Sequence, residues 1–165
     1  VISFKLLGVY LASTLSMENH INYVLLLVNQ RLYLINQLRK QGLSAKAREV
    51  VLHSLVISRL LYALPAFVGF LSGADIARFN SVFRKSVRWG IIDRMFDFDE
   101  LSISSQDQLF KRFSSNNNHC LHQLLPELRN TCYMLRQRGH SFSLPVVSRT
   151  LFKKSFVVNY LYSHM

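Results

Sequence analysis

The side chains of this sequence that could bind a metal ion are histidines and cysteines in its last third. A structural zinc site needs four nitrogen or sulfur ligands that converge, usually from pairs with about two to four residues between them. Cys120 and His122 are closer together than this, and Cys132 has no such neighbour. Scattered loop residues are therefore a better interpretation than a zinc site for the whole set, which is His119, Cys120, His122, Cys132 and His140.

The acidic side chains cluster in one stretch, FDFDEL, which contains Asp97, Asp99 and Glu100. Two-metal nucleotidyl transfer requires carboxylates that are held rigidly around one pair of metal ions. The stretch lies between predicted helices, so a solvated acidic loop is the better interpretation. The sequence also lacks a glycine-rich phosphate loop and a Gly-x-Ser-x-Gly nucleophile elbow. We expect no catalytic residue, no metal site and no cofactor in this chain.

The net charge is more informative, because 20 lysines and arginines face nine acidic residues, which gives +11. Such an excess indicates a polyanionic partner, although a basic protein without one stays possible. Basic residues can neutralise phosphates, and exposed aromatic residues can stack on bases. Aromatic residues near the basic ones are Tyr23, Tyr33, Tyr62, Phe83 and Trp89. Composition alone does not decide between a nucleic-acid surface and solvated basic faces over an aromatic core.

The charge is unevenly distributed along the chain. Residues 1–92 carry eleven basic and three acidic side chains. Residues 93–107 carry one basic and five acidic side chains, and residues 108–165 carry eight basic side chains and one acidic side chain. We interpret the acidic stretch as a connector between two basic parts. Two cysteines make no disulfide framework, so we expect a reducing intracellular setting, in the nucleus or cytoplasm. The longest apolar run, Leu60 to Leu71, is shorter than the roughly 20 residues of a membrane span, and we expect no membrane contact.

Hydrophobic periodicity predicts three helices, over residues 18–41, 45–63 and 74–91. Gly42 is expected to end the first helix and Ser44 to cap the second. Short connections between such helices favour a compact bundle. The apolar face of the first helix consists of Ile21, Val24, Leu25, Val28, Leu32, Ile35 and Leu38.

The remaining parts give weaker signals. FKLLGVYL, residues 4–11, alternates loosely and is predicted to be one strand. Ser105 and Gln108 have capping-box spacing before a short helix. Residues 151–162 could form a terminal helix or a strand, and their β-branched and aromatic residues favour the strand. The predicted fold class is mainly α: a three-helix bundle with a short N-terminal β-strand and a weakly structured C-terminal tail.

Several segments, taken in order, resemble the region after the polymerase palm in reverse transcriptases of non-LTR (LINE-type, jockey- or CR1-like) retrotransposons. The first three are FKLLGVYLASTLSMENHINYV, QRLYLINQLRKQGLS and LVISRLLYALPAF. Three later ones, HCLHQLLPELRN, LRQRGHSFSLP and KKSFVVNYLY, resemble the C-terminal tail of that family. The resemblance covers almost the whole chain, and it departs from the family pattern at Ala12, Met17 and Phe67.

The resemblance implies the C-terminal fragment of an RNA-directed DNA polymerase. Its parts would be a palm-edge strand (1–15), a thumb-like helical bundle (16–92), an acidic connector with a short helix (93–118) and a basic tail (119–165). The primer-side strand would include Phe4, Leu7 and Gly8. The expected partners are an RNA/DNA template–primer and the upstream palm and fingers. The residues expected to contact nucleic acid are Arg31, Arg39, Lys40, Lys46, Arg84, Lys85 and Arg88.

In that family the Tyr-x-Asp-Asp metal site lies upstream, and this sequence contains no adjacent Asp-Asp pair. The parent enzyme would use Mg²⁺ to copy RNA into DNA, whereas this chain is expected not to polymerise alone. Its start in mid-strand is expected to reflect a missing palm. Two alternatives stay open: a stand-alone helical domain that binds nucleic acid, and a helical scaffold for a partner protein.

Overall fold

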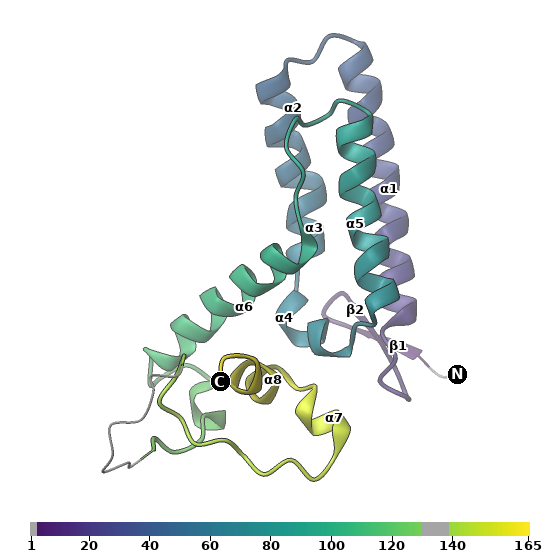
Figure 1. Ribbon diagram of the computed structural model, residues 1–165. Coiled ribbons are helices and arrows are strands. Elements are labelled where there is room, and N and C mark those ends of the chain that lie inside the picture. The colour runs from purple at the N-terminus through teal and green to yellow at the C-terminus, as the bar shows by residue number, and fades with distance from the viewer. Residues whose placement is uncertain (1–2, 130–138) are drawn as a thin grey trace.

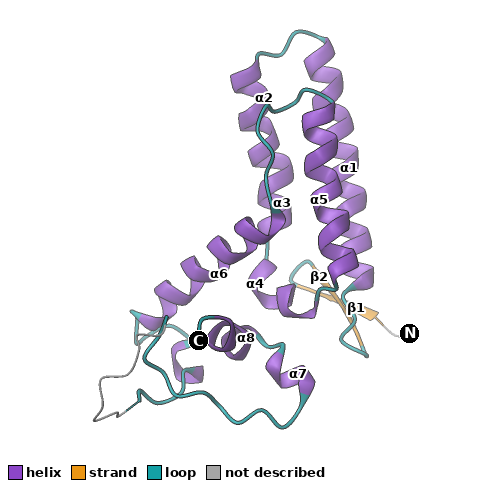
Figure 2. Ribbon diagram, in the orientation of Figure 1, coloured by secondary structure: helices purple, strands orange, loops and turns teal. Residues whose placement is uncertain are grey.

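The computed structural model describes residues 3–129 and 139–165, and it is mainly helical with a small N-terminal β-hairpin (Figures 1 and 2). Its elements in chain order are β1 (Ser3–Leu6), β2 (Val9–Ala12), α1 (Glu18–Lys40), α2 (Ala45–Leu52), the π-helical turn η1 (His53–Ile57), α3 (Ser58–Leu61), α4 (Leu64–Phe67), the 3-10 turn η2 (Val68–Phe70), α5 (Gly73–Arg88), α6 (Phe98–Ser114), the 3-10 turn η3 (His122–Leu124), α7 (Thr150–Lys153) and α8 (Phe156–Ser163).

The three long helical segments predicted from periodicity are present, each within three residues of the expected bounds. α1, the continuous run α2–η1–α3, and α5 lie side by side, and we call them the helical stem (Figure 1). α1 and α5 run in the same direction, and α2–η1–α3 runs in the opposite direction beside them. Ser44 caps α2 as predicted, since its hydroxyl accepts the N–H of Ala47 at 3.4 Å.

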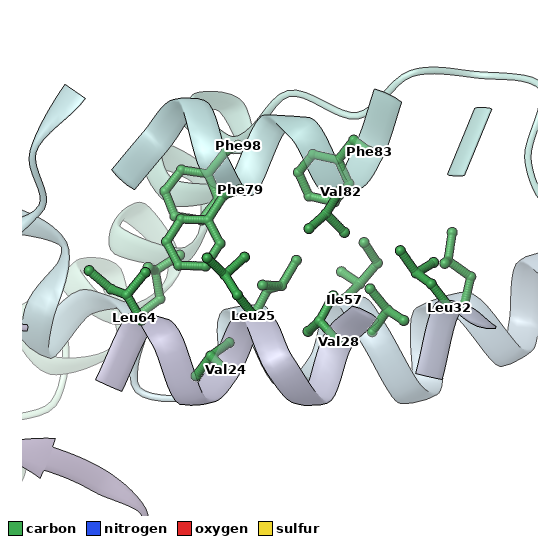
Figure 3. Packing of buried hydrophobic residues seen from close by; sticks show 14 of the residues in the cluster. Val24, Leu25, Val28, Leu32, Ile57, Leu64, Phe79, Val82, Phe83 and Phe98 are labelled. Atoms are coloured by element: carbon green, nitrogen blue, oxygen red, sulfur yellow. The ribbon is translucent and has the colours of Figure 1, made fainter. Parts of the chain in front are cut away.

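The core of the stem is built from the apolar faces of its three segments (Figure 3). Val28, Leu32 and Ile35 of α1 are fully buried, and Phe79 and Phe83 of α5 pack on the same cluster. Each such side chain contributes about 1.5–3 kcal/mol when it leaves water. The apolar faces that predict the helices therefore also hold them together.

The prediction of one continuous N-terminal strand is wrong. Leu7 and Gly8 both adopt positive φ angles, 46° and 86°, and they turn the chain back on itself. β1 and β2 pair antiparallel on either side of this turn, with Leu6 opposite Val9. A two-residue turn with both φ angles positive matches the twist of a hairpin, and glycine adopts it without steric cost. Alternation alone does not reveal that a strand folds back at its central glycine.

The acidic stretch is not the predicted loop, because it begins α6. Asp97 is the N-cap and accepts the N–H of Asp99 at 3.3 Å, while Asp99 and Glu100 lie in the first turn. Negative side chains at a helix N-terminus stabilise it by interacting with the helix dipole. The helix therefore starts about two turns before the predicted start at Ser105. Phe98 then stacks on Phe79 of the stem, with ring centroids 4.5 Å apart.

Residues 150–153 and 156–163 are helical, so of the two alternatives for this segment the strand, which composition favoured, is wrong. Their apolar side chains close a second core with the end of α6, where the rings of Phe110 and Tyr160 stack at 4.1 Å. The hydroxyl of Tyr160 donates to Asp107 at 2.8 Å. Burial is the main cause that raises the pKa of Tyr160, and the contact with Asp107 raises this pKa further. Packing against α6 has overridden β-propensity. The tail is therefore more ordered over these residues than expected.

One stretch of helix in residues 3–129 and 139–165, Ala45–Phe70, is long and apolar enough to cross a membrane by length and composition. It has 26 residues, and 39% of its most apolar part is buried inside the protein. Core helices pass the same test, so this observation has little weight. The absence of membrane contact stays a prediction.

Candidate nucleic-acid interface

Three elements place most of the predicted basic residues at one end of the helical stem. α1 ends at Lys40, α5 ends at Arg88, and α2 begins at Ala45, all at the end of the stem opposite the hairpin (Figure 1). The side chain of Arg39 extends from α1 to Gly90, just after the end of α5. The Nη1 atom of Arg39 lies 3.8 Å from the position that a Cβ atom would occupy on Gly90. The end of α1 is thus in contact with the residue that follows Trp89 at the end of α5, and the basic residues of both helix ends lie at the same end of the stem.

α5 supplies the outer face of this surface. Arg84 and Arg88 are exposed and four residues apart, which places them on the same side of the helix. The opposite side of α5 is buried in the core through Phe79, Val82 and Phe83. Because the core fixes the rotation of α5, it also fixes the direction in which Arg84 and Arg88 point.

Lys85 lies at the junction of α1 and α5 and is half-buried. Its Nζ donates to Oδ1 of Asn29 at 3.0 Å and lies 4.6 Å from the centroid of the Trp89 ring. Lys85 is therefore a cation held in place, in contrast to the exposed side chains of Lys40 and Lys46.

Arg31 does not belong to this surface. Its guanidinium donates to the backbone carbonyl of Leu55 in η1, and it connects α1 to the π-helical turn. Arg31 is nine residues after Asn22, which is about two and a half turns of α1, so the two side chains lie on opposite sides of the helix. The structure places six of the seven predicted residues on segments that meet at one end of the stem, and it places Arg31 in an exposed contact with η1.

The six cations have no acidic partner among the residues that the structure describes. The ion pairs found there join other groups, Arg78 with Asp75 at 3.5 Å and Arg94 with Glu49 at 3.2 Å, besides one at the C-terminus. Asp97, at the acid-rich start of α6, accepts from Asn80 at 3.4 Å, and Asn80 lies one turn before Arg84 on the same side of α5. Glu49 and Asp93 line a cleft with Lys46 and Arg94 at this end of the stem, so positive charge there is in excess but not unopposed. An excess of positive charge attracts polyanions.

The residues expected on the primer-side strand lie at the other end of the stem. Phe4 is 55% exposed and Leu7 is 83% exposed, while Gly8 packs against the ring of Tyr62. α1 separates the hairpin from Lys40 by about 30 Å, at 1.5 Å per residue. The two predicted sets of residues are each brought together, but at opposite ends of one helix.

Sequence reasoning missed a cluster of cations and aromatic rings beside the hairpin. The Nζ of Lys5 lies 5.3 Å from the ring of Tyr10 and 5.2 Å from that of Tyr23. The guanidinium of Arg59 lies 5.5 Å from Tyr23 and 5.7 Å from Tyr62. Lys5 and Tyr10 are opposite each other in the hairpin register, so the cluster was predictable only once the turn at Leu7–Gly8 was known.

His20 is buried beside this cluster, with 1% of its surface exposed. Its Nδ1 accepts the N–H of Tyr10 at 3.4 Å, and its Nε2 has no partner among the described residues. Burial, and then the charge of Arg59, lower the pKa of His20. The imidazole is thus held neutral where the hairpin meets α1.

The metal candidates are not brought together. In residues 3–129 and 139–165, no three histidine, cysteine, aspartate or glutamate side chains could share a metal ion. His122 instead contacts the carbonyl of Phe113, and His140 that of Leu161, both at 2.8 Å. Cys120 is exposed, and Cys132 lies outside the described residues.

Comparison with known proteins gives no relative: no protein-family model, no curated protein and no solved structure matches this chain.

Proposed function

We propose that this chain binds template–primer nucleic acid as the thumb-like C-terminal part of a non-LTR retrotransposon reverse transcriptase. The observation that carries the proposal is the set of cations at one end of the stem, which have no acidic partner among the described residues. Lysines and arginines of this kind bind phosphates and release counterions, which gives affinity without sequence preference. A rigid helical core under them keeps the surface in one shape.

The arrangement of the stem supports the thumb-like part of the proposal. Two segments that carry the resemblance, FKLLG and YALP, are 55 residues apart and contact each other, since the hydroxyl of Tyr62 donates to the carbonyl of Leu7 at 2.7 Å. The hairpin is thereby fixed at the base of a three-helix bundle. We propose that the hairpin continues the palm and that the bundle is the thumb.

The hairpin also offers a surface for the upstream palm and fingers. Leu6 and Leu7 line an apolar cleft of about 380 Å³ that is closed on the other side by Tyr62 and Phe67. Exposed apolar surface of this kind commonly marks a contact with another protein surface. In the parent enzyme, the palm would cover this cleft.

Catalysis is assigned to the parent enzyme, whose upstream aspartates would hold Mg²⁺. In this chain the carboxylate of Asp97 caps α6 and accepts from Asn80. Purified protein with Mg²⁺, deoxynucleotides and a primed RNA template should show no primer extension. Extension that is lost in an Asp97→Ala, Asp99→Ala variant would contradict this assignment.

Binding is tested by a salt titration with a short primer–template duplex. Each neutralised phosphate changes the slope of log K against log salt by roughly −0.9. Replacing Arg39 and Lys40 by alanine should weaken binding and flatten the slope by up to roughly two units. Weak binding by the wild-type protein, with a slope near zero, would contradict the proposal.

A role as a protein-interaction scaffold is the second candidate, and an apolar cleft near the C-terminus favours it. The cleft has a volume of about 460 Å³ and is lined mainly by aliphatic and aromatic side chains. Its apolar residues include Leu121, Leu124, Pro145, Phe152, Phe156 and Leu161. A scaffold of this kind predicts nucleic-acid binding that hardly responds to the Arg39 and Lys40 substitutions.

A further inference from the structure

Three asparagines follow one line along α1 at intervals of seven residues: Asn22, Asn29 and Asn36. Seven residues are about two helical turns, so these side chains lie on the same face and roughly 10 Å apart. Each of them accepts a hydrogen bond from a basic side chain. The line faces α5, because two of the three donors belong to that helix.

The first two contacts cross from α5 to α1 with the same offset. Arg78 donates to Oδ1 of Asn22 at 2.5 Å, and Lys85 donates to Oδ1 of Asn29 at 3.0 Å. Both pairs are separated by 56 residues, as expected for two parallel helices in constant register. The amide of Asn29 is itself oriented, because its Nδ2 donates to the carbonyl of Leu25 at 2.8 Å.

The third contact lies beyond the end of α5 and is built differently. α5 ends at Arg88, so none of its side chains reaches Asn36 in this register. The donor to Asn36 is instead Arg39, which belongs to α1 itself. Its Nε donates to Oδ1 of Asn36 at 3.2 Å, and its Nη1 lies beside Gly90. The row of cations therefore continues past the end of α5.

We infer that Asn22, Asn29 and Asn36 are positioning residues, which hold Arg78, Lys85 and Arg39 in one row as a track for a nucleic-acid backbone. This inference rests on the proposed function and adds to it the line that the backbone follows, along the junction of α1 and α5. A neutral amide fixes a cation without cancelling its charge, whereas a carboxylate would compete with phosphate. Arg78 alone is partly neutralised, by its ion pair with Asp75.

The length of the row fits a backbone. Three cations at two-turn intervals extend over about 20 Å. One strand of a duplex places a phosphate every 3.4 Å or so along the axis, so about six phosphates pass within this length. Lys40, Arg84 and Arg88 are exposed on the same two helices and would add contacts.

Leucine substitutions test the positioning role because they remove the acceptor and leave the net charge unchanged. Asn29→Leu frees Lys85, which must then be ordered on binding, and affinity for a primer–template duplex should fall about two- to tenfold. The triple variant Asn22→Leu, Asn29→Leu, Asn36→Leu should lose more. Asn19→Leu is the matched control: it is exposed on the same helix, and its side chain makes no hydrogen bond to the described residues.

Aspartate at the same position separates positioning from helix packing. Asn29→Asp gives Lys85 a charged partner, so thermal stability should not fall, while affinity falls and the salt slope decreases by up to about one unit. Asn19→Asp should change both quantities far less. A merely structural contact predicts that Asn29→Asp binds duplex as Asn19→Asp does.

The possible failures are distinguishable. If the wild-type protein shows no salt-dependent binding, the proposed function and this inference both fail. If the wild-type protein binds, and the triple leucine variant binds equally well, only the inference fails.

Discussion

The hydroxyl of Tyr62 donates to the backbone carbonyl of Leu7 at 2.7 Å, and this contact joins the tip of the hairpin to the end of α3. The ring of Tyr62 lies directly under Gly8, where a Cβ atom would come within 3.3 Å. A glycine and a tyrosine that are far apart in the sequence therefore fit each other. The hairpin is held in place from outside its own two strands.

Tyr62→Phe should loosen the hairpin without unfolding the stem. The substitution removes one hydrogen bond at a partly exposed site, which costs about 1 kcal/mol. Amide hydrogen exchange of β1 and β2 should become faster, while exchange in α1 and α5 stays unchanged. Tyr33→Phe, which removes an exposed hydroxyl elsewhere on the stem, is the control. Equal protection in both variants would show that the contact contributes nothing.

Gly69→Ala should weaken the packing of the C-terminal helices on η2. A Cβ at Gly69 would overlap the carbonyl oxygen of Lys154, so the two backbone segments must move apart. Overpacking of this kind typically costs about 1–3 kcal/mol, and the melting temperature should fall accordingly. Gly73→Ala is the matched control, because nothing lies within 4 Å of its Cβ position and alanine favours a helix. Similar melting temperatures for the two variants would contradict the close approach.

The buried state of His20 makes stability depend on pH. The pKa of His20 in the folded chain is below the ordinary value of 6.5. When the pH falls below 6.5, His20 is therefore protonated to a greater extent in the unfolded chain than in the folded chain. The free energy of unfolding should fall with decreasing pH by up to about 1.4 kcal/mol per unit from this group. Urea titrations between neutral and mildly acidic pH should show a smaller loss for His20→Asn, which keeps an acceptor for Tyr10. An unchanged pH dependence would contradict the burial of His20.

The sequence predicted the long helices well, because their apolar faces repeat over many turns. It failed where a local pattern has two solutions. Alternation over residues 4–11 fits one strand or a hairpin, and only the positive φ angles at Leu7 and Gly8 select the hairpin. The apolar run around Phe156 and Tyr160 favours a strand by composition, but it becomes helical because it packs on Phe110.

The candidate site was predictable in composition but not in arrangement. Residue types identified the basic residues, yet they could not show that Arg31 donates to the backbone carbonyl of Leu55. The asparagine row was equally hidden, because its meaning depends on the parallel course of α1 and α5. Contacts between helices that are distant in sequence decided which cations share a surface.

The salt slope of duplex binding, compared between two double variants of equal charge, tests the central claim most directly. Arg84→Ala, Arg88→Ala removes two exposed cations from the outer face of α5, and Lys111→Ala, Arg112→Ala removes two exposed cations from the end of α6. Specific contacts by α5 predict that only the first variant binds more weakly and has a slope smaller by up to about two units. Equal slopes in the two variants would mean that net charge alone attracts nucleic acid, and would contradict an interface on α5.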